Sequence, residues 1–397
     1  MTQHETTPIT RLANVRPWGG DAVDLDVDGA TIAAIHPHGA APEHAGIVVD
    51  GRGHCALPGI VNAHAHVDKS WWGLPWQSYA GEAGVDGRIR HERARRGELG
   101  IPSTPIAAAV LHEMVRHGTT AIRTHVDVDL GIGLAGIEAV QEAAAAYGGA
   151  LDVQIVAFPQ DGVLRRPGVD RLLRDAVEAG AVHVGGLDPA SIDRDPVGQI
   201  DLVMGLAADT GVGVDIHLHD PAELGAFQIE LVLERVERLG LQGRVVIAHG
   251  FAIAQLAPDR RAGLLRRMGE AGVGMTTVAP LRLPQLPMHE LADAGVRLGL
   301  GTDGIRDLWS PYGDGDTLAI ARQYARASSL VRDDDLERVV RLATTDGAWA
   351  VGRDVHDLVP GARADVVLVD AEHAMDALVR LPERRMVLAG GRVVATT

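Results

Sequence analysis

The chain has 397 residues, of which 46% are hydrophobic, so it can bury a large core, and one barrel domain can account for about 250 residues. A formal net charge of −16 argues against nucleic acid as a partner, because phosphate binding requires a basic face. No apolar run approaches the roughly 18 residues that span a bilayer, the start MTQHETTPIT does not resemble a signal peptide, and the single cysteine, Cys55, cannot form an internal disulfide. We therefore expect a cytoplasmic protein that binds a small molecule and binds neither a membrane nor a nucleic acid.

The first part of the chain is rich in short strand-like segments. Residues 9–50 alternate apolar and polar side chains between turns that contain Gly, Asp and His-Pro. We assign residues 1–56 to the N-terminal part of a small β domain.

The apolar run at residues 57–61 leads into the most informative motif, His64-Ala65-His66, which Lys69 follows closely. On an extended segment, imidazoles at positions i and i+2 point the same way, so both can bind one divalent cation. Lys69 is the only lysine of the chain, which favours a specific need for a compact ammonium group there. A solvated loop lysine is the alternative interpretation.

The first predicted barrel strand covers residues 57–66. Seven further strand-like runs follow it, and segments with helical periodicity lie between most of them. The strands are expected at residues 119–128, 152–160, 181–188, 212–220, 244–250, 272–280 and 296–303. The helices are expected at residues 105–117, 133–147, 168–179, 197–210, 222–239 and 258–271. This alternation predicts an α/β fold, a parallel (β/α)₈ TIM barrel over residues 57–350.

The last part of the chain is again β-rich, with GARADVVLVD and MVLAGGRVV within residues 361–397. We expect residues 351–397 to pair with residues 1–56 and to form a small β-sandwich domain beside the barrel.

Polar side chains stand at nearly every predicted strand end, and the carboxyl ends of barrel strands form the active face. These residues are His64, His66, His125, Asp127, Gln160, Asp188, His217, His219, Asp220, His249 and Asp303. A lone histidine at such a position is more often structural than functional. The combination of His-x-His on the first strand, histidines on the fifth and sixth, and an aspartate on the eighth predicts a metal site.

Several motifs resemble the amidohydrolase superfamily, and the resemblance covers nearly the whole chain: PGIVNAHAH, IHLHD, IAHG and GTDG. The stretches RTHVDVD and VQIVAFPQDGVL resemble the cytosine deaminase branch, and HVDKS is similar to the triazine-degrading enzymes that hydrolyse N-isopropylammelide. The resemblance implies that the metal ligands are His64, His66, His217 and Asp303, with His249 as a catalytic histidine and Gln160 as a substrate contact.

The resemblance also implies the kind of cofactor, with Zn²⁺ as the first expectation and Fe²⁺ as the second. Two-metal members of the superfamily bridge their ions with a carboxylated lysine on the fourth strand, and the fourth strand here, AVHVGGLD, has no lysine. We therefore expect one divalent ion per chain.

Such an ion can lower the pKa of a bound water from about 15.7 to roughly 7, and the hydroxide can then attack an electron-poor carbon. Asp303 can take the proton of the water, and His249 can hydrogen-bond the developing oxyanion. Asp220 stands where cytosine deaminases have a glutamate that carries a proton to the ring nitrogen, and Glu223 is the alternative shuttle. Because Gly304 also replaces an aspartate of that branch, cytosine itself is not favoured as the substrate.

The substrate side of the site is predicted from nearby cationic and aromatic side chains. Lys69 can orient a substrate anion or an acidic neighbour, while Trp71 and Trp309 can stack on a flat heterocycle or simply pack the loops. Arg282 and Arg306 are candidate contacts for a carboxylate.

The combined expectation is a metal-dependent hydrolase that removes an amino or alkylamino group from a nitrogen heterocycle of the pyrimidine, triazine or pterin type. Two alternatives stay open: hydrolysis of a cyclic or linear amide, and a barrel that binds metal and ligand without turnover. The sequence also leaves open the exact substrate, the native metal and whether the protein is a homo-oligomer.

Overall fold

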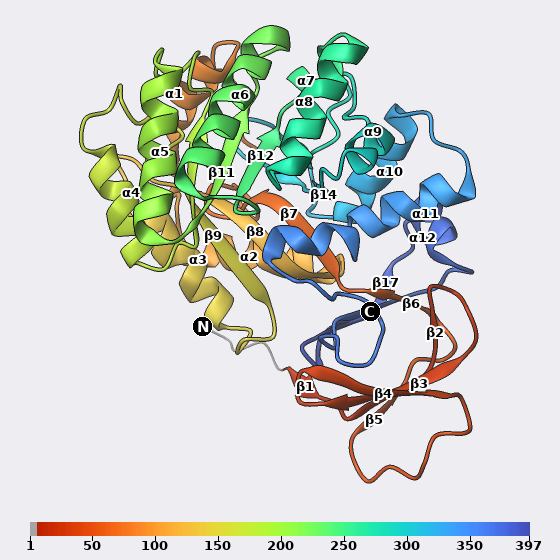
Figure 1. Cartoon of the computed structure of the whole chain (residues 1–397). Helices are drawn as coiled ribbons and strands as arrows, with labels where there is room; N and C mark the ends of the chain where they lie inside the picture. The colour runs from red at the N-terminus through yellow and green to blue at the C-terminus, as the bar shows by residue number, and fades with distance from the viewer. Residues whose placement is uncertain (1–5) are drawn as a thin grey trace.

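The structure is a computed structural model that describes residues 6–397. It consists of a barrel with surrounding helices and a separate sheet built from the two ends of the chain (Figure 1). The barrel strands are β7 Ile60–His66, β8 Thr119–Asp127, β9 Asp152–Phe158, β10 His183–Leu187, β11 Gly213–Leu218, β12 Val245–His249, β13 Gly274–Thr277, β14 Leu298–Leu300 and β15 Asp303–Gly304.

The barrel closes through one short segment, residues 298–304. The parallel sheet runs in the order β14-β13-β12-β11-β10-β9-β8-β7-β15, so both of its edges belong to this segment. β14 pairs with β13, whereas β15 pairs with β7, where Asp303 lies opposite Ala65 and Gly304 opposite His66. The predicted (β/α)₈ barrel is therefore confirmed, with its eighth strand in two pieces.

Helices cover the outside of the barrel (Figure 1). They are α2 Thr104–Arg116, α3 Ala135–Ala145, α4 Val169–Glu178, α5 Pro196–Thr210, α6 Ala222–Leu239, α7 Ala252–Gln255, α8 Pro258–Glu270, α9 Met288–Asp293, α10 Thr317–Ala327, α11 Asp333–Leu342 and the 3₁₀ helix η2 Asp346–Val351. Local signals fix their ends: α5 begins after Asp195, whose side chain accepts from the amide of Gly198, and ends at Gly211 in the left-handed conformation.

The two ends of the chain meet in one mixed sheet, as expected. Its strands are β1 Thr7–Pro8, β2 Arg11–Pro17, β3 Val23–Asp28, β4 Thr31–Pro37, β5 Val48–Asp50, β6 Cys55–Pro58, β16 Val366–Val369, β17 Arg384–Ala389 and β18 Arg392–Thr396. The order is β1-β18-β17-β16-β6-β2-β3-β4, with β5 beside β2. Leu12, Leu25, Ile32 and Leu388 belong to a hydrophobic core of its own.

Three elements differ from the sequence expectations. The run at 57–66 divides at Gly59, where a Cβ would lie 2.2 Å from Oγ1 of Thr120, so its first residues join the terminal sheet. The β-rich C-terminal part contains a helix, α12 Ala374–Arg380. The third is an unpredicted helix, α1 Val85–Arg95, continued by the 3₁₀ helix η1 Arg96–Leu99, in the long connection after β7.

A buried ion pair joins the terminal sheet to the barrel. Arg384 of β17 lies 2.6 Å from Oδ1 of Asp316, which caps α10, and its Nε donates to the carbonyl of His117. Among the described residues, every helix is too short or too polar to cross a membrane.

Candidate active site

Three imidazoles and one carboxylate converge at the carboxyl end of the barrel. Nε2 of His66 lies 3.2 Å from Oδ1 of Asp303 and 3.3 Å from Nε2 of His217, and Nε2 of His64 lies 3.7 Å from the same Asp303 oxygen. The period of two along β7 directs His64 and His66 to the same side, as the sequence predicted. The four expected metal ligands are thus brought together.

The protonation states and unpartnered atoms of this cluster fit a bound cation. Burial, together with Lys69 for His66 and His125 for His217, holds the pKa values of these two imidazoles well below their ordinary range, so both are neutral. Burial alone would raise the pKa of Asp303, but the nearby imidazoles of His64 and His66 hold it well below the usual range.

Hydrogen bonds, present and absent, show which imidazole atoms are free to bind a metal. Nδ1 of His66 lies 3.0 Å from the carbonyl oxygen of His125, which fixes the tautomer that leaves Nε2 free as a ligand. Both ring nitrogens of His64 and Nδ1 of His217 are buried without a hydrogen-bond partner among the described residues. Donors of this kind, in this number, suit Zn²⁺ or Fe²⁺.

His249 stands beside this cluster at the end of β12. Its ring centre lies 4.9 Å from that of His64 and 5.1 Å from that of His217, and burial, followed by the nearby His219, lowers its pKa well below the ordinary value. His249 and Asp303 have φ values of 68° and 61°, in the left-handed region that costs energy for residues with a side chain. Strain of this kind is concentrated at functional sites.

A cavity of about 1100 Å³ opens above the cluster. Several expected site residues line it, namely His66, Lys69, Gln160, His217, His249, Asp303 and Trp309. Phe158 forms part of the wall and stacks on His217, with ring centres 4.2 Å apart and an angle of 22°. The cavity is thus large enough for a substituted heterocycle and partly aromatic.

Lys69 is buried in a polar network rather than solvated. Its Nζ lies 2.5 Å from Oε1 of Gln160 and 3.3 Å from Oδ1 of Asp127, while Nε2 of Gln160 donates to the other Asp127 oxygen over 2.9 Å. Burial would lower the pKa of Lys69, but Asp127 and Glu92 raise it, so the ammonium stays charged. Asp127 thereby sets the orientation of two side chains that face the cavity.

Trp71 and Asp220 are directed elsewhere. Trp71 is fully buried, donates from Nε1 to the carbonyl of Asp307, and does not line the cavity. The Asp220 carboxylate accepts from Nε2 of Gln228 over 2.9 Å and from the hydroxyl of Ser191, and it also lies outside the lining.

The alternative shuttle, Glu223, is exposed and pairs with Arg260. Of the two arginines suggested for carboxylate binding, Arg282 lines the outer cavity, whereas Arg306 lies over the ring of Trp71.

His219 occupies the place that was expected for Asp220. It lines the cavity, its ring centre lies 4.2 Å from that of His249, and its Nδ1 lies 3.0 Å from Oδ2 of Asp188. Burial would lower the pKa of His219, but the charge and hydrogen bond of Asp188 raise it above the ordinary value. The signal was present in the sequence, because His219 follows His217 by two residues and therefore shares its face.

A buried charged layer supports the ligands from below. Oδ1 of Asp215 lies 3.3 Å from Nε2 of His125, and Arg123 lies 3.4 Å from the other Asp215 oxygen. These residues precede His217 and Asp127 by two or four positions on the same strands, so they face the barrel interior one layer deeper.

Helix α1 forms one side of the cavity and was not expected. Ile89 packs with Phe158 and Leu187, while Glu92 accepts from Nε1 of Trp309 over 2.5 Å. Val85 and Arg88 of the same helix line the cavity.

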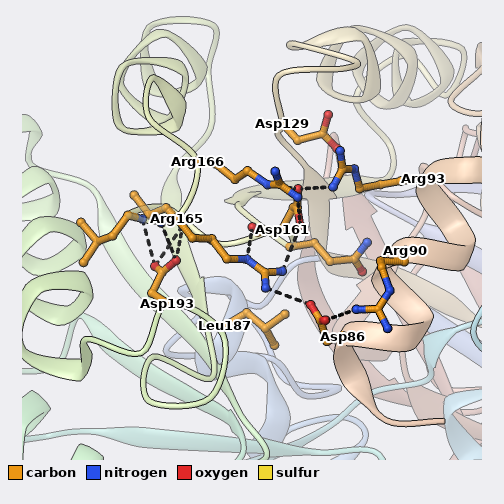
Figure 2. A network of polar contacts seen from close by, with 12 residues as sticks. Asp86, Arg90, Arg93, Asp129, Asp161, Arg165, Arg166, Leu187 and Asp193 are labelled. Atoms are coloured by element: carbon orange, nitrogen blue, oxygen red, sulfur yellow. Dashed lines mark hydrogen bonds and ion pairs between the residues drawn. The ribbon is translucent and has the colours of Figure 1, made fainter. Parts of the chain in front are cut away.

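Ion pairs centred on Asp161, the residue after Gln160, hold α1 in this position (Figure 2). Asp161 pairs with Arg93 of α1 at 2.7 Å, with Arg165 at 2.9 Å and with Arg166 at 2.5 Å. Arg165 also reaches Asp86 of α1, at 2.9 Å. The loop that carries Gln160 is therefore tied to α1.

Comparison with known proteins shows the family to which the chain is related. The sequence pattern of the amidohydrolase family matches residues 103–395. N-isopropylammelide isopropyl amidohydrolase from Pseudomonas sp. strain ADP is 29% identical over 357 residues, covering 87% of each chain. Among solved structures, N-isopropylammelide isopropylaminohydrolase from Burkholderia multivorans is 42% identical with a TM-score of 0.93, and 5-methylcytosine deaminase from Klebsiella pneumoniae is 25% identical with a TM-score of 0.82. Each match covers 98% of both chains.

Proposed function

The chain belongs to the amidohydrolase family, and we propose that it hydrolyses the bond between a nitrogen heterocycle and an amino or alkylamino substituent. The observation that carries the proposal is the convergence of His64, His66, His217 and Asp303 beside a cavity with an aromatic wall. The names of the relatives, which include an N-isopropylammelide amidohydrolase and a 5-methylcytosine deaminase, support this substrate type.

The four converging residues would hold one divalent ion, with Zn²⁺ as the first candidate and Fe²⁺ as the second. Such an ion, when bound, supplies an activated water and polarises the bond under attack. Asp303 is ionised and can accept the proton of the attacking water, since its carboxylate belongs to the same cluster.

His249 and His219 would handle charge and protons on the substrate. His249 lies next to the ligand cluster, where it can hydrogen-bond the oxygen that forms on the attacked carbon. His219 is oriented by Asp188, and we assign to it the proton transfer to the departing or ring nitrogen. We prefer His219 to Asp220 for this role because both Asp220 oxygens are already engaged by Ser191 and Gln228.

Gln160, Lys69 and Trp309 would orient the ring. Gln160 and Lys69 present amide and ammonium groups to the cavity, and Asp127 holds both in place. The faces of Trp309 and Phe158 can contact a flat heterocycle.

The test is release of ammonia or amine from a panel of aminopyrimidines, alkylamino-triazines and pterins by the Zn²⁺-loaded protein. We expect turnover of at least one class, and loss of that turnover in His249→Asn with the metal retained. Hydrolysis of cyclic or linear amides alone, or binding of the heterocycles with no product, would contradict the proposal.

A further inference from the structure

The arginines of the helical segment after β7 are paired with one exception. Four of them reach carboxylates: Arg90 pairs with Glu82 and Asp86, Arg93 with Asp161, Arg95 with Glu98 and Arg96 with Asp129. The guanidinium of Arg88 makes neither an ion pair nor a hydrogen bond with any residue between 6 and 397. The guanidinium instead lies over the ring of Trp309, whose centre is 5.9 Å from the Arg88 Cζ.

The unpaired arginine is the one that faces the cavity. Arg88 is half-buried, lines the cavity wall and shares Trp309 with Lys69, whose Nζ lies 5.4 Å from the same ring. An anion at Arg88 would therefore belong to a molecule that also contacts the ring-orienting residues Lys69 and Trp309.

None of the four carboxylates that line the cavity pairs with Arg88, and each is engaged by another group; Asp314 accepts from the amide of Asp316. Asp307 accepts from the amides of Trp309 and Ser310, and Asp316 pairs with Arg384. Asp303 belongs to the ligand cluster. In a chain of net charge −16, the cavity thus retains an uncompensated cation, which attracts and orients anions in a concave site.

The position of Arg88 is fixed by its own helix. One turn on, Glu92 accepts from Nε1 of Trp309, and the neighbouring Ile89 packs on Phe158. The outer side of α1 is tied to the Gln160 loop by Arg93 and Asp161 (Figure 2). The helix thus holds the backbone of Arg88 at the cavity wall, from where its guanidinium can bind a carboxylate through two parallel N–H donors.

We propose that Arg88 binds a carboxylate carried by the substrate, so that the substrate is an acid-bearing heterocyclic amine. The inference rests on the proposed function, since it places the carboxylate on the molecule whose carbon–nitrogen bond is hydrolysed. Water adds oxygen to the ring carbon, the carbon–nitrogen bond breaks, and the amine leaves with the proton; the carboxylate takes no part in this balance. It sits either on the departing amine or on the ring.

Matched acid and amide substrates test the proposal and separate these two positions. The first pair is a dihydroxytriazine that carries a carboxymethylamino or a carbamoylmethylamino group, and the second is a 4-aminopyrimidine carboxylic acid and its carboxamide. For at least one pair, we expect kcat/KM of the wild-type protein to favour the acid by roughly 10-fold or more, the scale of a charge-assisted hydrogen bond. Arg88→Gln should abolish the preference by lowering turnover of the acid, with the amide changed less than about 2-fold.

Arg95→Gln is the matched control, because Arg95 lies on the same helix and pairs with the exposed Glu98. It should leave the acid-to-amide ratio unchanged. Equal turnover of acid and amide by the wild-type protein in both pairs, or an equal loss for both in Arg88→Gln, would overturn the proposal.

If the wild-type protein hydrolyses none of these four compounds, calorimetric binding of the same pairs to the metal-free protein decides the role of Arg88. The proposed function fails only if the panel of aminopyrimidines, alkylamino-triazines and pterins is not hydrolysed either. Tighter binding of an acid, lost in Arg88→Gln, supports the carboxylate site. Equal binding of acid and amide overturns it.

Discussion

His66 illustrates, at the scale of a single residue, how the fold prepares an imidazole to bind a metal. Its Nδ1 is oriented by the carbonyl of His125, while burial and Lys69 keep the ring neutral, so the Nε2 lone pair points into the cluster. His217 is neutral for the corresponding reason, burial beside other imidazoles. We therefore expect each of the four proposed ligand residues to contribute to metal affinity.

Removal of one ligand should release the metal. We expect His217→Ala to lose most of its metal and the wild-type protein to retain about one ion per chain, because four donors converge on one point. Elemental analysis after exchange into metal-free buffer measures both. His183→Gln, a change at the opposite end of the neighbouring strand β10, should keep the metal, and two ions per wild-type chain would contradict a single-metal site.

The adjacent residues His219 and Asp220 should differ sharply in catalysis. We expect His219→Asn to lower kcat by roughly 10²-fold, the scale of a lost acid–base group, whereas Asp220→Asn should keep kcat within a few-fold. Steady-state kinetics with the substrate found in the panel, together with metal analysis of both variants, make the comparison. The reverse order of effects would return the proton shuttle to Asp220.

The convergence of the proposed ligand residues could be predicted because period-two alternation and strand ends are sequence properties. His64, His66, His217 and Asp303 all follow apolar runs at the carboxyl ends of strands. The same alternation separates His219 from Asp220, since neighbouring residues on an extended segment face opposite sides. The role expected of Asp220 followed the resemblance to cytosine deaminases instead of this alternation.

At the scale of elements, α1 could not be recognised from its sequence. The residues VDGRIRHERAR are polar at most positions and lack the apolar stripe of a surface helix. Tertiary contacts hold the helix instead, with Asp161 on one side and Phe158 and Leu187 on the other. Pairings between residues about 70 positions apart leave no periodic signal in the chain.

Loss of the Asp161 charge should loosen α1. Asp161 is buried and faces three arginines, so Asp161→Asn removes three ion pairs at once. We expect KM to rise several-fold with a smaller change in kcat, because the Gln160 loop and α1 shape the binding site. Trypsin should also cleave faster at the arginines of α1.

Glu98→Gln is the control for Asp161→Asn, since it breaks only the exposed pair between Glu98 and Arg95. Its KM and cleavage rate should match those of the wild-type protein. Unchanged KM and cleavage in Asp161→Asn would mean that the apolar contacts of Ile89 suffice to hold α1.

At the scale of the whole molecule, the chain ends form a sheet that packs beside the barrel (Figure 1). The pairing of β6 with β16 joins residues more than 300 positions apart, and its prediction rested on the shared β-rich composition of both ends. The resemblance to the amidohydrolase superfamily, which included such ends, is confirmed by the family match. The order of the strands could not be predicted from composition, because it depends on which strand edges meet in space.

Breaking the ion pair between sheet and barrel should destabilise the protein. Arg384→Met leaves the buried Asp316 carboxylate without its cation, and such a loss costs about 3–5 kcal/mol in the free energy of unfolding. Urea unfolding followed by circular dichroism measures it. The double variant Arg384→Met/Asp316→Asn keeps a capping side chain without a charge and should recover part of the loss, and a cost below about 1 kcal/mol for the single variant would contradict the argument.

A metal bound at this site would also affect the closure of the barrel at residues 298–304. The last barrel strand, β15, pairs with β7 at Asp303 and Gly304, so the proposed ligands His64 and His66 lie on one strand of this pair and Asp303 lies on the other. A cation bound there would hold β15 and β7 together, so metal binding and closure of the barrel would be thermodynamically linked. At a free ion concentration 100 times the Kd, metal binding would add about 2.7 kcal/mol to the free energy of unfolding. Removal of the ion should therefore first increase local opening of the barrel next to Thr302, which would appear as faster hydrogen exchange of the amides of residues 301–304.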